Sequence, residues 1–127
     1  MTRVLIVDDD DQLRRSVERV LTSSGFECRS VGTVQAALDA VAADGPDIVL
    51  LDVELGAGSG IDVHRALRKK HARMPAVIFS TSRRDVFPTM LEQIGPLDDW
   101  IIKPWDAAEF LARVELASRR LVIDRGA

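Results

Sequence analysis

The sequence predicts an α/β fold in which helices cover both faces of a five-stranded, doubly wound parallel sheet. Two observations favour it: short apolar runs recur along the chain, and segments with helical spacing of apolar residues separate them. Strands that alternate with helices form βα units, whose right-handed crossovers make the strands parallel. The length of 127 residues fits one domain.

Four apolar runs of three or four residues are the predicted central strands. Because polar residues do not alternate within them, each run suits a strand that is buried on both faces. A weaker run predicts a fifth strand near the sheet edge. The four runs are Val4–Val7, Ile48–Leu51, Ala76–Phe79 and Trp100–Ile102, and the weaker one is Cys28–Val31.

Apolar residues at helical spacing predict a helix after each strand. Thr33 and Asp106 are the expected N-caps of the second and the last helix. The fourth helix is expected from about Phe87, because Pro88 lacks an amide hydrogen and is tolerated only in a first turn. The other four predicted segments are Leu13–Leu21, Val34–Val41, Ile61–Leu67 and Ala107–Leu121.

Composition and charge exclude several classes of protein. With 46% hydrophobic residues, 29% charged residues and a net charge of −3, this segment is typical of a globule and is not expected to bind nucleic acid. No run approaches the roughly 18 apolar residues of a membrane helix, and the N-terminal apolar run is too short for a signal peptide. Cys28 has no second cysteine to pair with, so we expect a cytoplasmic protein. We expect residues 1–122 to form the domain and 123–127 a tail or the start of a linker to an effector.

Polar residues directly follow four of the predicted strands. Because ligands of open α/β sheets bind at the carboxyl ends of the strands, where the winding direction reverses, we expect these side chains to converge. In chain order they are Asp8–Asp11, Asp52, Ser80-Thr81 and Lys103-Pro104.

The chemistry of these residues suits phosphoryl transfer. Carboxylates crowded at one site repel one another unless a cation joins them, and oxygen ligands suit Mg²⁺. The strand ends carry no histidine or cysteine, which argues against zinc. Lys103 could pair with Asp52 at rest and with a phosphoryl oxygen afterwards, while Ser80 supplies a neutral donor. A carboxylate nucleophile, a divalent cation, a lysine and a hydroxyl are the parts that this reaction needs.

Each of these residues also has a structural explanation when it is taken alone. We assign Asp10 and Asp11 to helix capping or solvation, and a serine after a strand is commonly a turn residue. Structural roles do not explain why all four kinds of residue occur at strand ends together.

The order and spacing of five segments resemble the receiver domains of two-component response regulators. The resemblance covers residues 3 to about 121, nearly the whole chain. It implies the flavodoxin-like strand order 2-1-3-4-5. The segments are VLIVDDD (4–10), PDIVLLDVELGAGSG (46–60), MPAVIFSTS (74–82), DDWIIKPW (98–105) and EFLARVELASRR (109–120).

The resemblance implies a phosphoacceptor and a metal site. Asp52 would take a phosphoryl group from a phosphohistidine on a sensor histidine kinase or a phosphotransfer protein, and the phosphoaspartate would then hydrolyse in the same site. Mg²⁺ would be the cofactor, with Asp9 as a direct ligand and Asp8 binding through water or orienting the site. Glu54 would contribute its backbone carbonyl. The domain would be a signalling switch rather than an enzyme.

The resemblance also implies how the switch would work. Lys103 would contact a phosphoryl oxygen, and its peptide bond to Pro104 would be cis. Ser80 would be the switch hydroxyl, which moves to hydrogen-bond the phosphoryl group. Trp100 would be the switch aromatic, which turns inward when the hydroxyl moves. The face formed by the fourth helix, fifth strand and fifth helix would carry the output.

A homodimer is a further expectation, since some relatives pair through the segment that contains Asp98 and Asp99. In this chain Asp98, Asp99, Glu109 and Arg113 are candidates for salt bridges between subunits. His64, on the third predicted helix, is expected at the surface or its boundary.

Departures from the family pattern keep two alternatives open. Gly56 replaces a frequent proline, Thr81 replaces a small alanine, and Trp100 is bulkier than the usual tyrosine. These three departures favour the first alternative, an interaction module that signals without phosphate. The triplet Asp8–Asp10 is also found in Mg²⁺-dependent aspartyl-phosphate phosphatases. Gln12 and the short chain argue against this second alternative, a phosphatase.

Overall fold

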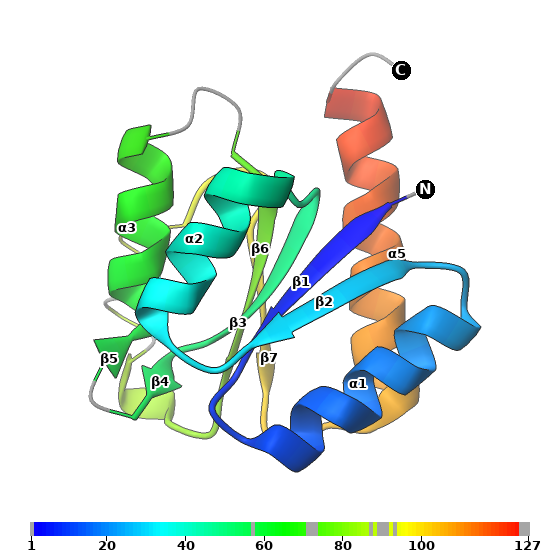
Figure 1. The fold of residues 1–127 in the computed structure, drawn as a ribbon, viewed down its shortest axis with the longest axis horizontal. Coiled ribbons are helices and arrows are strands. Elements are labelled where there is room, and N and C mark those ends of the chain that lie inside the picture. Colours follow the sequence, from blue (N-terminus) through cyan, green and yellow to red (C-terminus); the bar gives the residue numbers. More distant parts are fainter. Residues whose placement is uncertain are drawn as a thin grey trace.

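A parallel sheet forms the centre of the molecule (Figure 1). The computed structural model describes residues 2–56, 58–70, 74–86, 88, 92 and 94–124. Within these residues five strands form one sheet in the order β2-β1-β3-β6-β7, and every neighbouring pair is parallel. This is the predicted order 2-1-3-4-5. The strands are β1 (Arg3–Val7), β2 (Glu27–Val31), β3 (Ile48–Asp52), β6 (Ala76–Thr81) and β7 (Asp99–Ile102).

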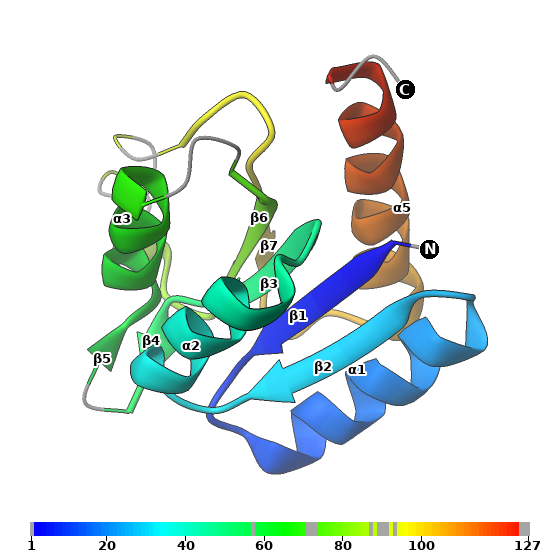
Figure 2. The ribbon, with the colours of Figure 1, turned by 45° about the horizontal axis from the view of Figure 1, so that its top comes forward.

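Helices cover both faces of the sheet, as expected (Figures 1 and 2). One pair packs on one face and the second pair on the other, and each face has its own hydrophobic core. The pair on the first face is α1 (Asp11–Ser23) and α5 (Ala107–Asp124), and the pair on the second is α2 (Val34–Asp44) and α3 (Gly60–Lys70).

The alternation of side chains along each strand explains the two cores. In β1, Val4 and Ile6 pack with α1 and α5, whereas Leu5 and Val7 pack with α2 and α3. All four are at most 2% exposed. A buried aliphatic side chain of this size contributes about 1.5–3 kcal/mol, so unbroken apolar runs stabilise a strand from both sides.

Helix ends follow the predicted caps. The Asp10 carboxylate accepts hydrogen bonds from the amides of Gln12 and Leu13, and the Thr33 hydroxyl accepts one from Ala36. At α5, Asp106 Oδ1 accepts from the Glu109 amide at 2.8 Å. These contacts satisfy amides that have no partner within the first turn of a helix.

The segment after β3 departs from the sequence prediction. A short antiparallel pair, β4 (Glu54–Leu55) and β5 (Gly58–Ser59), precedes α3. A single turn of 3₁₀ helix, η1 (Arg84–Val86), follows β6. The predicted fourth helix, from about Phe87, falls mainly outside the described residues.

Candidate functional site

Three carboxylates meet at the carboxyl end of the sheet. Asp8 follows β1 and Asp52 ends β3, and because these strands are neighbours their ends lie side by side. Ligand atoms of Asp8, Asp9 and Asp52 all lie within 4.8 Å of one another. Asp8 is 4% exposed and Asp52 is 5% exposed, while Asp9 faces solvent. The cluster therefore has a buried base and an open side.

Lys103, after β7, supplies the positive charge of the site. Its Nζ donates to Asp8 Oδ2 at 2.9 Å and to Asp52 Oδ2 at 3.2 Å. Burial opposes the charged ammonium, but the hydrogen bond to Asp8 and the charge of Asp52 outweigh it and raise the pKa of Lys103 above its ordinary value. The lysine therefore stays charged and offsets part of the repulsion between the two carboxylates.

Asp52 still has an excess of negative charge around it. Burial, followed by the charge of Asp8, raises the pKa of Asp52 to about 6, although the Glu54 amide and Lys103 act in the opposite direction. The amide of Glu54 donates to Asp52 Oδ1 at 3.1 Å. At neutral pH the carboxylate is ionised, desolvated and only partly neutralised. A carboxylate in this state is stabilised by any further cation that enters the site.

Hydrogen bonds to their carboxylates or backbone hold Asp8 and Asp9 in place. The amide of Asp10 donates to Asp8 Oδ1 at 2.9 Å, and the Arg14 guanidinium donates to the Asp8 carbonyl at 2.6 Å. The Gly56 amide donates to Asp9 Oδ2 at 3.0 Å. Gly56 has φ of +58°, a conformation that favours glycine. A proline at this position could neither adopt that φ nor donate this hydrogen bond.

The donor set of this cluster fits a magnesium ion. Carboxylates are hard oxygen ligands, and two or three of them beside an open face leave room for the waters that Mg²⁺ keeps. Among the described residues, no histidine or cysteine joins this cluster of carboxylates. The amide donors to Asp8, Asp9 and Asp52 each leave further carboxylate lone pairs for a metal.

Ser80 lies beside Asp52 in the sheet, with its side chain engaged elsewhere. The register pairs Asp52 with Ser80, and Ser80 in turn with Ile101. The Ser80 hydroxyl is buried, and its Oγ accepts a hydrogen bond from Nε1 of Trp105 at 3.1 Å. Sequence reasoning named Ser80 but gave Trp105 no role. No local sequence signal marks Trp105 for this contact, which joins residues 25 positions apart. The peptide bond between Lys103 and Pro104 is cis.

Thr81 and Glu54 form a second contact near the site. The Thr81 hydroxyl donates to Glu54 Oε1 at 3.0 Å and accepts from the Arg83 amide. Thr81 is fully buried at the end of β6. The added hydroxyl at this position therefore ties the β3–β4 segment to the end of β6.

Three of the four predicted interface residues, Asp98, Asp99 and Arg113, have side-chain partners inside the chain. Arg113 Nη1 donates to both carboxylate oxygens of Asp99, at 2.8 and 3.0 Å. Asp98 lies 2.7 Å from Nε2 of His64, and its side chain is 5% exposed. The expectation that His64 lies at the surface or its boundary was wrong, since His64 is 0% exposed beneath Phe79. Burial also removes Asp98 from the surface on which a salt bridge between subunits would form.

Trp100 and Glu109 lie on the outside of the molecule. Trp100, on β7, is 39% exposed, so the indole is not packed inward in this state. Glu109 is exposed in the first turn of α5.

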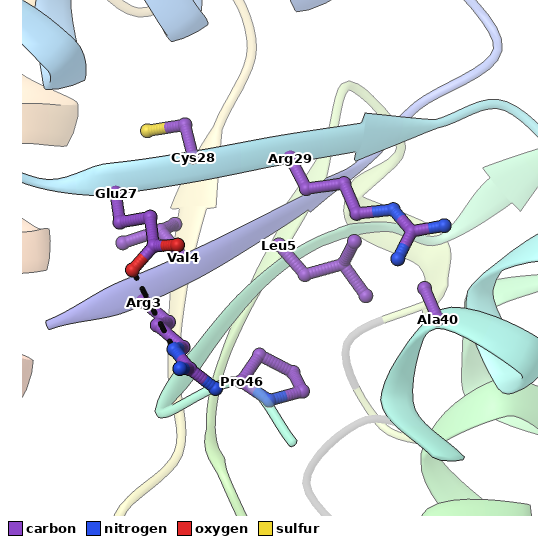
Figure 3. A pocket seen from close by; sticks show the side chains of 8 residues that line it. All are labelled: Arg3, Val4, Leu5, Glu27, Cys28, Arg29, Ala40 and Pro46. Atoms are coloured by element: carbon purple, nitrogen blue, oxygen red, sulfur yellow. Dashed lines mark ion pairs between the residues drawn. The ribbon is translucent and has the colours of Figure 1, made fainter. Parts of the chain in front are cut away.

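A separate cavity lies at the opposite end of the sheet, at the amino ends of β1 and β2 (Figure 3). It measures about 330 Å³ and is bounded partly by the ion pair between Arg3 and Glu27, 3.5 Å apart. The Cys28 thiol points away from this cavity, toward the core beneath α1 and α5, and burial raises its pKa, which lowers its reactivity. The carboxylate cluster and this cavity therefore occupy opposite ends of β1.

The described helices include none with the length and apolar character of a membrane span.

Comparisons with known proteins show the family and agree with the fold. The family model of the response regulator receiver domain matches residues 4–115. Response regulator MprA of Mycolicibacterium vanbaalenii is 35% identical over 98% of this chain and 54% of its own length. DNA-binding response regulator MtrA of Mycobacterium tuberculosis is 39% identical over 93% of this chain and 51% of its own length. The chain thus spans about half the length of the curated relatives it matches. The crystal structure of NtrX from Brucella abortus has the same fold, with a TM-score of 0.87 and 24% identity over 99% of this chain and 29% of that chain.

Proposed function

The chain belongs to the response regulator receiver domain family, and from this premise we propose that it takes a phosphoryl group onto Asp52. The observation that carries the proposal is the position of the Asp52 carboxylate, buried between the Lys103 ammonium and the carboxylate of Asp8. Burial of a nucleophile among fixed charges is the arrangement by which proteins accelerate phosphoryl transfer.

Mg²⁺ is the proposed cofactor. Asp8, Asp9 and Asp52 would hold it, and the family resemblance adds the backbone carbonyl of Glu54. The bound cation would neutralise negative charge on the transferred phosphoryl group. The open side at Asp9 supports this assignment, because an incoming phosphoryl oxygen and several waters need coordination positions on that side.

The transfer itself is a displacement at phosphorus. An oxygen of the Asp52 carboxylate attacks the phosphorus of a phosphohistidine, the P–N bond breaks, and its electron pair stays on the imidazole nitrogen, which then takes up a proton. Lys103 is placed to shift its hydrogen bond from Asp52 to an oxygen of the phosphoryl group. Hydrolysis then removes the phosphoryl group: water attacks phosphorus, the P–O bond to Asp52 breaks, and inorganic phosphate leaves.

The conformational part of the proposal uses Ser80 and Trp100. Ser80 neighbours Asp52 in the sheet, so its hydroxyl can reach a phosphoryl oxygen after a change of rotamer. Trp100 lies one strand further out and pairs with Phe79 in register, so movement at the end of β6 reaches it directly. The output face would be that of the fourth helix, β7 and α5.

The proposed partner is a sensor histidine kinase or a phosphotransfer protein, and a cytoplasmic location is part of the proposal. Homodimerisation through the outer face of β7 and α5 is proposed on the exposed Glu109, with Asp99 and Arg113 available if their internal pair opens. DNA binding, which the name of MtrA states for a protein about twice as long, is not proposed for these 127 residues.

Intact-mass measurement after incubation with acetyl phosphate and Mg²⁺ tests the proposal. We expect the native chain to gain one phosphoryl group and Asp52→Asn to gain none. Asp62→Asn is the matched control, because the Asp62 side chain is 67% exposed on α3, and it should react like the native chain. Absence of any mass gain, together with absence of Mg²⁺ binding, would reject the proposal and favour the phosphate-independent interaction module.

A further inference from the structure

The indole of Trp105 and the hydroxyl of Ser80 form a hydrogen bond that the reaction scheme above does not use. Trp105 Nε1 donates to Ser80 Oγ at 3.1 Å, and Ser80 is 1% exposed. Among the described residues, the Ser80 side chain makes no other hydrogen bond. The Ser80 Oγ therefore bonds to Trp105, whereas the carboxylate of Asp52, its register partner, bonds to the Glu54 amide and Lys103.

Packing fixes one side of Trp105 and leaves space on another. Its ring contacts the buried Phe110 edge to face, with ring centroids 4.7 Å apart and an interplanar angle of 65°. Such aromatic pairs contribute beyond their buried area, so the ring is well anchored. Trp105 also lines a surface cavity of about 410 Å³ with Leu13, Ser82 and Pro104. The indole thus has a rigid support and room for a small rearrangement.

The indole N–H uses a lone pair of Ser80 Oγ and leaves the serine hydrogen to donate elsewhere, so the contacts with Trp105 and with a phosphoryl group exclude each other through the rotamer that positions Oγ. A change between staggered rotamers moves a serine Oγ by roughly 2 Å, which is enough to break a hydrogen bond of ordinary length. A phosphoryl oxygen on Asp52 would be a charged acceptor, and hydrogen bonds to charged groups are roughly twice as strong as neutral ones. The phosphorylated site would therefore compete successfully with the indole for Ser80.

We propose that Trp105 is a positioning residue that holds the Ser80 hydroxyl away from Asp52 and releases it when Asp52 is phosphorylated. The inference rests on the proposed function and adds a restraint to it. The indole N–H is the part that acts on Ser80, and the ring is the part that packs on Phe110. Substitutions can therefore separate the two roles.

The ¹H–¹⁵N NMR signal of the indole N–H reports on this contact directly. The chain has two tryptophans, so Trp100→Phe assigns the Trp105 signal. In the native chain, Mg²⁺ with beryllium fluoride, a stable mimic of the phosphoryl group, should move the Trp105 signal upfield and speed its exchange with water. In Ser80→Ala, the Trp105 signal should already lie at this upfield position without the mimic. Adding the mimic to Ser80→Ala should move the signal no further.

A kinetic measurement tests the restraint itself. Trp105→Phe keeps an aromatic ring against Phe110 but removes the donor, so it should raise the steady-state fraction of phosphorylated protein relative to the unphosphorylated one by about fivefold, the factor that a typical net hydrogen bond represents. In the Ser80→Ala background the same substitution should have no effect on that ratio. An equal effect in both backgrounds would mean that Trp105 acts through packing and would overturn the proposal.

The outcomes for the two levels of the account are distinct. If acetyl phosphate adds a phosphoryl group to Asp52 while the Trp105 signal stays in place, the restraint is overturned and the phosphoacceptor function stands. If neither acetyl phosphate nor beryllium fluoride reacts with the native chain in the presence of Mg²⁺, both are overturned. Because the NMR comparison uses the native chain and Ser80→Ala, it does not depend on the folding of Trp105→Phe.

Discussion

Lys103 Nζ lies 3.2 Å from Asp52 Oδ2, although 51 positions separate the two residues in the sequence. The contact exists because β3 and β7 lie on either side of β6 in one parallel sheet, so their carboxyl ends open on the same edge. The same ammonium also reaches Asp8 at the end of β1. One lysine thus joins two carboxylates that the fold forces together.

Neutralising Asp52 should stabilise the metal-free protein at neutral pH. Burial and the charge of Asp8 raise the pKa of Asp52 from 3.8 to about 6, so the folded state holds this proton more tightly than the unfolded state. Protonation of Asp52 therefore adds up to roughly 3 kcal/mol to the free energy of unfolding. This contribution is fully present below about pH 4 and is lost as the pH rises through about 6. Thermal melts with a chelator should show Asp52→Asn above the native chain at pH 7 and equal to it near pH 4. A difference that does not vary with pH would contradict this explanation.

Mg²⁺ should raise the melting temperature of the native chain. A ligand that binds only the folded state at 100 times its dissociation constant stabilises it by about 2.7 kcal/mol. Asp9→Asn removes a carboxylate from the open side of the cluster, so its Mg²⁺-dependent shift should be much smaller. The control is Asp62→Asn, whose exposed carboxylate on α3 is not part of the cluster, and its shift should equal that of the native chain. Equal shifts for all three proteins would place the metal elsewhere.

Replacing Lys103 by Met should lower both stability and phosphorylation. Lys103→Met keeps the length of the side chain but leaves Asp8 and Asp52 without their shared cation, which should cost about 1–3 kcal/mol at this partly buried site. Phosphorylation by acetyl phosphate should slow by at least about tenfold, the effect of losing one charged contact to the phosphoryl group. Chemical unfolding should show a smaller loss when Lys103→Met is combined with Asp52→Asn. Additive losses would mean that the two side chains do not interact.

Gly60→Ala should displace Asp52 through a clash with its backbone. A Cβ at Gly60 would lie 2.1 Å from the Asp52 carbonyl oxygen and 3.1 Å from Leu51 Cγ. Since backbone atoms cannot rotate away, β3 and α3 must separate, at a cost of about 1–3 kcal/mol. The rate of phosphorylation should fall with the stability.

Gly45→Ala is the matched control for that variant. Gly45 has φ of +58° and open space around its Cβ position, so alanine there strains the backbone by roughly 1–2 kcal/mol without touching the site. Its phosphorylation rate should stay at the native level. A similar fall in rate for both variants would attribute the effect to stability alone.

The sequence predicted the strands and the carboxylate cluster well because both depend on local pattern. An unbroken apolar run such as Ile48–Leu51 has few structural alternatives, and the residue after it must lie at the sheet edge. Asp8, Asp52 and Lys103 follow such runs, so parallel pairing alone brings them together. The two-residue strands β4 and β5 were missed because a segment of that length has no periodicity.

Contacts between distant side chains were beyond the reach of sequence pattern. His64 lies among charged residues on a short helix, and its burial depends on Asp98, which is 34 positions away. Trp105 bonds to Ser80 across two strand ends, and apolar character alone would assign it to the core. In both cases the packing of one element on another decides the role, and the residue type does not.

Reduction of the phosphorylated protein with borohydride tests the central claim most directly. Borohydride converts an aspartyl phosphate to homoserine, which peptide mass spectrometry locates at a single position. After treatment with acetyl phosphate and Mg²⁺, the account predicts homoserine at residue 52 in the native chain and none when Mg²⁺ is chelated. Homoserine at Asp8 or Asp9, or at residue 52 regardless of Mg²⁺, would contradict it.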